Sequence, residues 1–192
     1  DFADHPDFAE IWAKRGMVMS KVFDAPAATR EIRYRDLAPA VRECDLFDSV
    51  LGERAGQYTE PFMTAASPGI VCTTMRNGGF YDSHESYVRA VAREMKQEYE
   101  LIHDRGYLLQ LDCPDLAMEW HGMFQHGTLK DFQDAIAIHI DAINEACVNI
   151  PKDRIRLHVC WGNYDGPHDH DVPMADILPV IRNANVGAFS LE

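Results

Sequence analysis

The stretch RLHVCWGN, residues 156–163, decides both the fold and the chemistry expected of this chain. Apolar and β-branched residues lead into it and Gly162 and Asn163 end it, which predicts a strand followed by a turn. Residues i and i+2 of a strand share a face, so His158 and Cys160 are expected to point the same way. A neutral imidazole and a thiolate are preferred zinc ligands, so this strand end provides half of a metal site. Taken alone the pair is a weak signal, because a buried thiol beside a hydrogen-bonded histidine gives the same pattern.

The chain has 192 residues, 46% of them hydrophobic, which suits one globular domain over residues 1–192. Its net charge of -13 repels nucleic acid and anionic membranes, and neither is expected as a partner. The sequence shows no apolar run of transmembrane length and no basic N-terminal leader. It leaves the oligomeric state open, with a homo-oligomer among the options.

The cysteines indicate the redox compartment of the protein, and the chain ends indicate whether the sequence is part of a longer one. Five cysteines, an odd number, lack the regular spacing of a secreted disulfide framework, and most lie in or beside apolar segments. This usage favours a reducing cytoplasm. The chain begins at Asp1 without a methionine and stops at Glu192, where a strand is expected to end. We therefore expect a portion of a longer protein.

The second half of the chain alternates strands with helices, which predicts an α/β fold with a parallel sheet and helical crossovers. Capping signals mark the helix starts, and Gly106 is expected to end the first of these helices. The predicted elements are β structure in 61–75 broken at 67–69, a helix from an Asp82 cap with Glu85 to about Arg105, a strand 107–112, a helix after Thr128, a strand 154–160, a helix 174–183 and a strand 186–191.

The first part of the chain is harder to interpret. Residues 7–19 and 37–51 are predicted to be helical, and residues 31–35 could form a strand. We assign no separate domain to this part.

Three successive predicted strands end in polar residues: Asp112, then His158 with Cys160, then Glu192. Parallel strands joined by helices all run in the same direction, so their carboxyl ends gather on one face of the sheet. Active sites of β/α barrels are built from such strand ends. The pattern therefore predicts a metal or catalytic site, although a single strand-end carboxylate more often caps a loop.

Four motifs together resemble the cobalamin-independent methionine synthases. They are His158-Val159-Cys160 before a Gly/Asn turn, Ser190-Leu191-Glu192, the strand LQLDCP at 109–114 and the segment ASPG at 66–69. The resemblance covers about residues 60–192 in order. The long stretch from Cys160 to Pro173 is similar to the shorter single-barrel relatives, which include the epoxyalkane:coenzyme M transferases.

The resemblance implies a (β/α)8 TIM barrel that is incomplete in this chain, and a zinc cofactor. It implies that His158, Cys160 and Glu192 are zinc ligands, with a second cysteine from a later strand. It also implies that Asp112 is a catalytic residue that contacts the amino group of homocysteine, and that Ser67 binds substrate. Cys113 stands where the family motif has a glutamate, which is a departure in the amino-acid-binding half of the site.

The implied reaction joins a small-molecule thiol to an alkyl donor. Zinc coordination deprotonates the thiol at neutral pH, and the bound thiolate attacks the alkyl carbon. Transfer of a methyl group from a methylated folate to homocysteine is the first expectation. Transfer to another thiol, such as coenzyme M attacking an epoxide, is the alternative. An inactive barrel that serves as a binding scaffold is a third option from another class.

Other histidines have more than one possible role. His168 and His170 lie in an Asp-rich loop after the zinc strand; His168 is the candidate for acid/base catalysis, with metal ligation or a solvated loop as alternatives. His121 and His126 could touch a substrate, although surface or core positions explain them as well. His139 falls on the more polar side of its helix, and we assign it no role.

Overall fold

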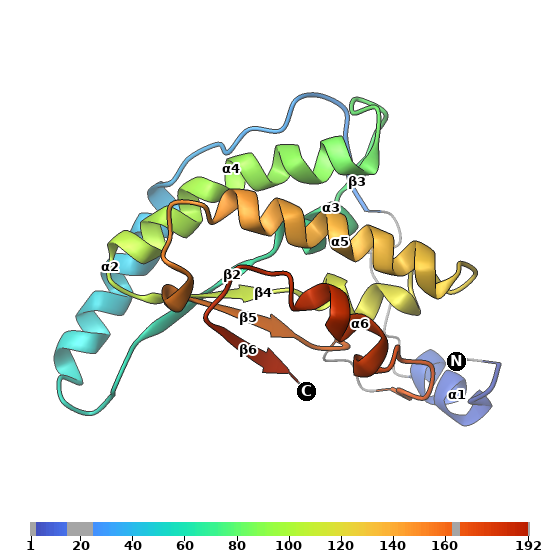
Figure 1. Cartoon of the computed structure of the whole chain (residues 1–192). Helices are drawn as coiled ribbons and strands as arrows, with labels where there is room; N and C mark the ends of the chain where they lie inside the picture. The colour runs from blue at the N-terminus through green and yellow to red at the C-terminus, as the bar shows by residue number, and fades with distance from the viewer. Residues whose placement is uncertain (1–2, 15–24, 163–165, 192) are drawn as a thin grey trace.

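The computed structural model describes residues 3–14, 25–162 and 166–191 (Figure 1). Four strands form one parallel sheet in the order β2 (Phe62–Ala66), β4 (Leu108–Asp112), β5 (Ile155–Val159) and β6 (Ala188–Leu191). Helices alternate with these strands along the chain, so the predicted α/β class is confirmed. Within the described ranges the sheet is open at β2 and β6, and these strands do not close into a barrel.

The helices α4 (His84–Asp104) and α5 (Leu129–Ala146) pack side by side over one face of the sheet, and α6 (Met174–Ile181) packs against α5 (Figure 1). Their apolar stripes are buried as the helical spacing predicts, since residues three and four apart share a face. Burial of each large aliphatic side chain stabilises the fold by about 1.5–3 kcal/mol. The fully or almost fully buried members include Val88, Val91, Tyr99, Ile102, Phe132, Ile136, Ile140 and Ile143.

Alternate residues of the strands face this helical layer. Leu109 and Leu111 of β4 and Leu157 of β5 are completely buried there. The intervening residues point to the opposite face, which carries half-buried polar groups. On that face the Arg156 Nε donates to Gln110 Oε1 at 2.7 Å.

Two helix starts show how local chemistry sets the boundaries. Thr128 caps α5 as predicted, and its hydroxyl accepts from the backbone N–H of Asp131 at 3.2 Å. The prediction that Asp82 caps α4 is wrong. Ser83 is the N-cap, and Ser83 and Ser86 form reciprocal side chain–backbone bonds of 3.0 and 3.1 Å. The reciprocal pair satisfies two otherwise unpaired backbone donors, which explains why the cap lies one residue later.

A second correction concerns residues 68–74, which form the helix α3 (Pro68–Thr74) instead of continuing the β structure. Ser67 is the N-cap, with its Oγ accepting from Ile70 N at 3.0 Å, and Pro68 opens the first turn. These are strong helix-start signals, and they outweigh the β-branched residues that follow. The short strand β3 (Arg76–Asn77) then pairs in parallel with β1 (Ala27–Ala28) in a separate two-stranded sheet.

The N-terminal region forms α1 (Pro6–Lys14) and α2 (Ala38–Glu53), and Pro39 is accommodated in the first turn of α2. The rest of the predicted helix 7–19, from residue 15, lies outside the described residues. The suggested strand at 31–35 is wrong, because the segment is irregular and its backbone N–H groups bond to side chains of the α4 region. The described residues also form the short 3-10 helices η1 (Pro114–Leu116), η2 (Met118–Trp120) and η3 (Lys152–Arg154).

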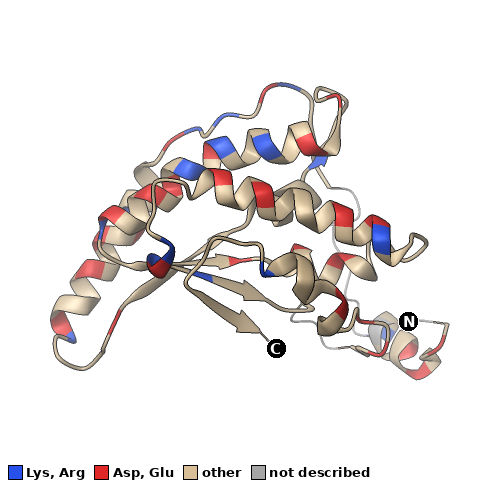
Figure 2. Ribbon diagram, viewed as in Figure 1, with Lys and Arg blue, Asp and Glu red and all other residues tan. Residues whose placement is uncertain are grey.

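Acidic side chains are spread over α2, α4 and α5 and outnumber the basic ones (Figure 2). The strand ends of the main sheet are less heavily charged than the helices in this view. Among the described helices, none combines the length and apolar character needed to cross a membrane.

Candidate functional site

The carboxyl ends of β4, β5 and β6 place three polar residues in a row across the sheet. Asp112 is in register with His158, and His158 is in register with Ser190. Backbone bonds fix this arrangement, since Cys113 N donates to His158 O at 2.9 Å and Ser67 N donates to Asp112 O at 3.0 Å. The parallel sheet therefore brings Asp112 and His158 together.

The His158 ring lies between its two neighbours with one nitrogen toward each. Its Nε2 is 3.8 Å from Asp112 Oδ1, and its Nδ1 is 3.2 Å from the Ser190 carbonyl oxygen. The Ser190 hydroxyl also lies 3.3 Å from this Nδ1. In the tautomer with the hydrogen on Nδ1, the ring donates to the Ser190 carbonyl and keeps a lone pair on Nε2. A second partner that fixes the tautomer in this way is typical of a metal-binding histidine. The Asp112 side chain is half exposed and accessible to a ligand.

Cys160 follows β5 directly, two residues after His158, and its side chain is half-buried. The turn after it is held by the Trp161 indole, whose Nε1 donates to Val172 O at 2.8 Å, and by Gly162 with φ 89°. The predicted third ligand, Glu192, lies outside the described residues. Within the described ranges, no three His, Cys, Asp or Glu side chains are arranged to hold a metal ion.

Two residues of the expected substrate site are buried. Ser67 is 0% exposed, and its hydroxyl donates to Asp115 Oδ1 at 2.5 Å while capping α3. Cys113 is also fully buried, and burial, together with the charge of Asp115, raises the pKa of its thiol well above the usual value. In this conformation the Ser67 hydroxyl is committed to Asp115, and its role in substrate binding stays a prediction.

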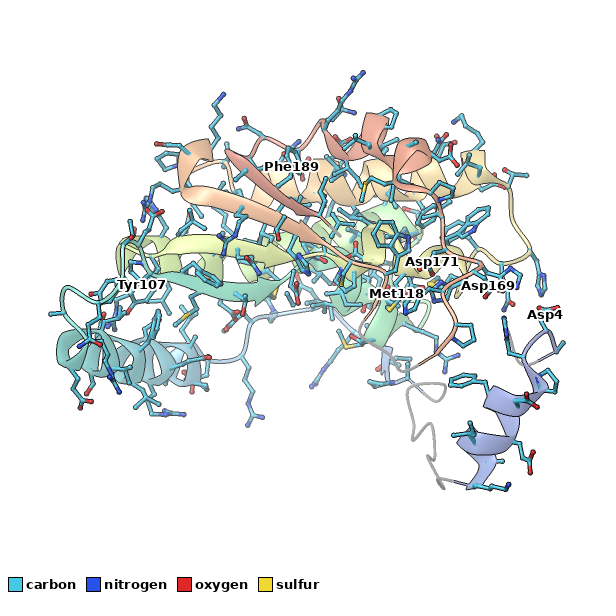
Figure 3. The ribbon with its side chains drawn as sticks, turned by 90° about the horizontal axis from the view of Figure 1, so that it is seen from below. Asp4, Tyr107, Met118, Asp169, Asp171 and Phe189 are labelled. Atoms are coloured by element: carbon cyan, nitrogen blue, oxygen red, sulfur yellow. The ribbon has the colours of Figure 1, made fainter. Side chains whose placement is uncertain are left out.

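The candidate acid/base residue His168 belongs to a partly exposed His/Asp cluster, in which Asp171 is the most buried carboxylate. Its Nδ1 is 2.7 Å from Asp171 Oδ2, and the other oxygen of Asp171 is 3.2 Å from Nδ1 of His121. Figure 3 shows Asp4, Asp169 and Asp171 gathered at the end of the molecule opposite to Tyr107. The cluster joins the loop 166–171 to the start of α1, because His5 pairs with Asp169 at 2.9 Å and His170 with Asp4 at 3.2 Å.

A buried polar chain behind the strand ends was missed by the sequence analysis. It begins with the Ser67–Asp115 bond, and Asp115 Oδ2 then meets His139 Nδ1 at 2.8 Å. His139 Nε2 in turn meets Nε2 of His84 at 2.8 Å. Asp115 is 0% and His139 is 5% exposed, so the assignment of His139 to a polar helix face without a role is wrong.

The two imidazoles meet end to end. Their ring centroids are 5.1 Å apart, which is close to the 2.8 Å nitrogen separation plus the two centroid-to-nitrogen distances. This is the geometry of an N–H···N hydrogen bond. A tetrahedral zinc ion, at about 2.0–2.1 Å from each nitrogen, needs the two nitrogens more than about 3 Å apart. The His84 pKa is lowered, first by burial and then by His139.

Gly69 is the sequence signal that could have located this chain. A Cβ at Gly69 would overlap the Asp115 carboxylate and lie 2.5 Å from His139 Nδ1. Only glycine therefore fits where α3, η1 and α5 meet. From the sequence, Ser67-Pro68-Gly69 indicated a break in β structure and part of the family resemblance, but not a close approach of α3 to a buried carboxylate.

Comparison with known proteins does not assign the chain to a family. No family model matches the chain, and no curated protein matches it. The functional interpretation therefore depends on the residues themselves.

Proposed function

We propose that the protein is a zinc-dependent transferase that moves a methyl or other alkyl group to a small-molecule thiol. The observation that carries this proposal is the meeting of Asp112 and His158 at the carboxyl ends of two parallel strands, with Cys160 two residues beyond His158. A rigid strand end with an imidazole and a thiol is suited to zinc, and a carboxylate beside it can orient a substrate.

We further propose that the sheet belongs to a TIM barrel of the methionine synthase type. The four strands are parallel, helices cover one face, and polar side chains such as Gln110 and Arg156 line the other. In a barrel this second face points inward, and the site lies at the carboxyl ends of the strands. A cytoplasmic location is part of the proposal, since a reducing compartment keeps Cys160 available as a thiolate ligand.

The donor set of this site fits zinc. In the tautomer that donates from Nδ1 to the Ser190 carbonyl, His158 presents Nε2 to the metal, and Cys160 directly follows the same strand. Glu192 is the third proposed ligand, and the resemblance implies a second cysteine from a later strand as the fourth. Zinc bound there supplies the acidity that keeps a substrate thiol in its nucleophilic thiolate form.

The remaining residues act on the substrate. The half-exposed Asp112 carboxylate accepts a charge-assisted hydrogen bond from a substrate ammonium and so orients the acceptor. His168, held by Asp171 through Nδ1, accepts or returns a proton at Nε2 as the acid/base group.

Homocysteine is the first proposed acceptor, and a different thiol is the second. The second is favoured by one observation: Cys113 is fully buried, so its side chain does not replace the glutamate of the family motif in contacting an amino acid. An acceptor without an ammonium group, such as coenzyme M, needs no such contact.

The deciding experiment is zinc analysis and X-ray absorption at the zinc edge of the full-length protein, with and without candidate thiols. We expect about one zinc per chain, and one thiol that adds a Zn–S contact at about 2.3 Å. Cys160→Ser should lose zinc and activity together, whereas Cys147→Ser, a buried thiol at the end of α5, should keep both. Zinc retained with full activity in Cys160→Ser overturns the ligand assignment, and hydrolase activity with no response to any thiol overturns the reaction.

A further inference from the structure

A cavity of about 590 Å³ lies between α3, α4, α5 and the segment after η2. This volume is in the range that accommodates small organic molecules. Its walls are mainly apolar and aromatic, and none of the strand-end residues Asp112, His158 and Cys160 lines it. The aromatic and large aliphatic lining residues are Tyr87, Met123, Phe124, Phe132, Ile136 and Ile138.

Two carboxyl groups are buried in the cavity wall. Asp115 is 0% exposed and Glu119 is 6% exposed. Burial, and next the charge of Asp115, raises the pKa of Glu119. A positive charge beside Glu119 would relieve both effects, because it stabilises the ionised carboxylate.

The cations near the cavity do not supply that charge. Among the described residues, Arg76 is the only lysine or arginine in the cavity wall. Its side chain is exposed, and its Nη2 donates to Ala25 O at 3.3 Å. Lys130 is on the surface, paired with Asp134. Within the described ranges, no lysine or arginine is among the groups that shift the pKa of Glu119.

The imidazole pair cannot balance both carboxylates either. Two hydrogens cannot fit between nitrogens 2.8 Å apart, so His84 and His139 together carry at most one positive charge. Ionised Asp115 and Glu119 together carry two negative charges. When both carboxyls are ionised, the buried part of the cavity wall therefore has a net negative charge. This holds whether the histidine pair is neutral or carries one positive charge.

We propose that this cavity binds an organic cation with an apolar body, of the aryl-alkyl ammonium class. The ammonium group donates to the Glu119 carboxylate, and the apolar body packs against Phe124 and Phe132, whose ring centroids are 5.2 Å apart. The charge-assisted bond and the attraction between a cation and aromatic faces both favour an amine over a neutral molecule of the same shape. The site is separate from the proposed zinc site and does not depend on it.

Titration calorimetry of the whole chain in the presence of a chelator tests the proposal. The probe is phenethylamine, and the neutral match is 2-phenylethanol. We expect the amine to bind at least about tenfold more tightly than the alcohol, as a hydrogen bond between charged groups predicts. Lowering the pH should weaken amine binding, because burial raises the pKa of Glu119 and its protonated carboxyl no longer carries the charge that pairs with the ammonium.

Three variants make the outcome decisive. Glu119→Gln should reduce amine affinity to that of the alcohol, whereas Glu53→Gln, an exposed carboxylate at the end of α2, should leave it unchanged. Ala135→Phe fills the cavity from the half-buried face of α5 and should abolish binding of both probes, with circular dichroism to verify folding. Equal affinity for amine and alcohol, no loss in Glu119→Gln, or no binding of the amine to the wild type each overturns the proposal.

Discussion

Replacing Gly69 by alanine sets helix propensity against packing. Gly69 is the second residue of α3, and Gly→Ala inside a helix normally stabilises by about 0.5–1 kcal/mol. Here the added methyl group would overlap the carboxylate of Asp115 and approach His139 Nδ1 to 2.5 Å. Asp115 is completely buried and holds two hydrogen-bond partners in this position. Its displacement breaks the hydrogen bonds from Ser67 and His139.

The magnitude follows from these two bonds. Each hydrogen bond to a charged group contributes about 1.5–3 kcal/mol, so their loss costs about 3–6 kcal/mol. After the gain in helix propensity is subtracted, Gly69→Ala should lower the free energy of unfolding by about 2–5 kcal/mol. With a urea slope of about 2 kcal/mol per molar, the unfolding midpoint should fall by at least about 1 M.

The assay is urea unfolding followed by circular dichroism. Gly52→Ala is the matched control, since Gly52 lies in the exposed last turn of α2 with nothing within 4 Å of an added Cβ, and its midpoint should stay or rise. In an Asp115→Ala background the same Gly69 substitution should cost less, because the overlap with the carboxylate is gone and only the close contact with His139 Nδ1 remains. The reasoning is refuted if Gly69→Ala unfolds at or above the wild-type midpoint.

The remaining predictions concern pH, capping and the strand-end site. The folded protein lowers the pKa of His84 from its ordinary 6.5, so the stability this group contributes is present above that value and lost as pH falls below it. Wild-type unfolding free energy should therefore drop from about pH 7.5 to 5.5 more than that of His84→Gln, and parallel pH curves would contradict this. Ser83→Ala should cost about 1 kcal/mol in urea unfolding, whereas Asp82→Ala should be nearly neutral; the reverse order would restore Asp82 as the cap. His158→Ala should abolish zinc binding in the full-length protein with little change in unfolding midpoint, because its side chain lies on the half-buried face of β5; unchanged zinc content would remove it from the ligand set.

The sequence alone predicted the parallel α/β arrangement and the strand ends. Each signal is local: alternation within β4 and β5, the Thr128 cap with Asp131 three residues on, and a positive φ at Gly106 that ends α4. Interactions within four residues determine these elements. The meeting of Asp112 and His158 also followed from sequence, because equal strand direction brings carboxyl ends to one edge.

The tertiary structure decided what distant residues do to one another. His139 follows a polar pattern on its own helix, yet it is buried because Asp115 and His84, from other elements, converge on it. The same convergence commits Ser67 to a buried carboxylate and requires glycine at position 69. The spacing of residues in the sequence predicts which side chains share a face of one helix or strand. A buried polar chain instead depends on how separate elements pack. Its stability comes from satisfying groups that would be costly to bury alone, and that requirement exists only in the folded protein.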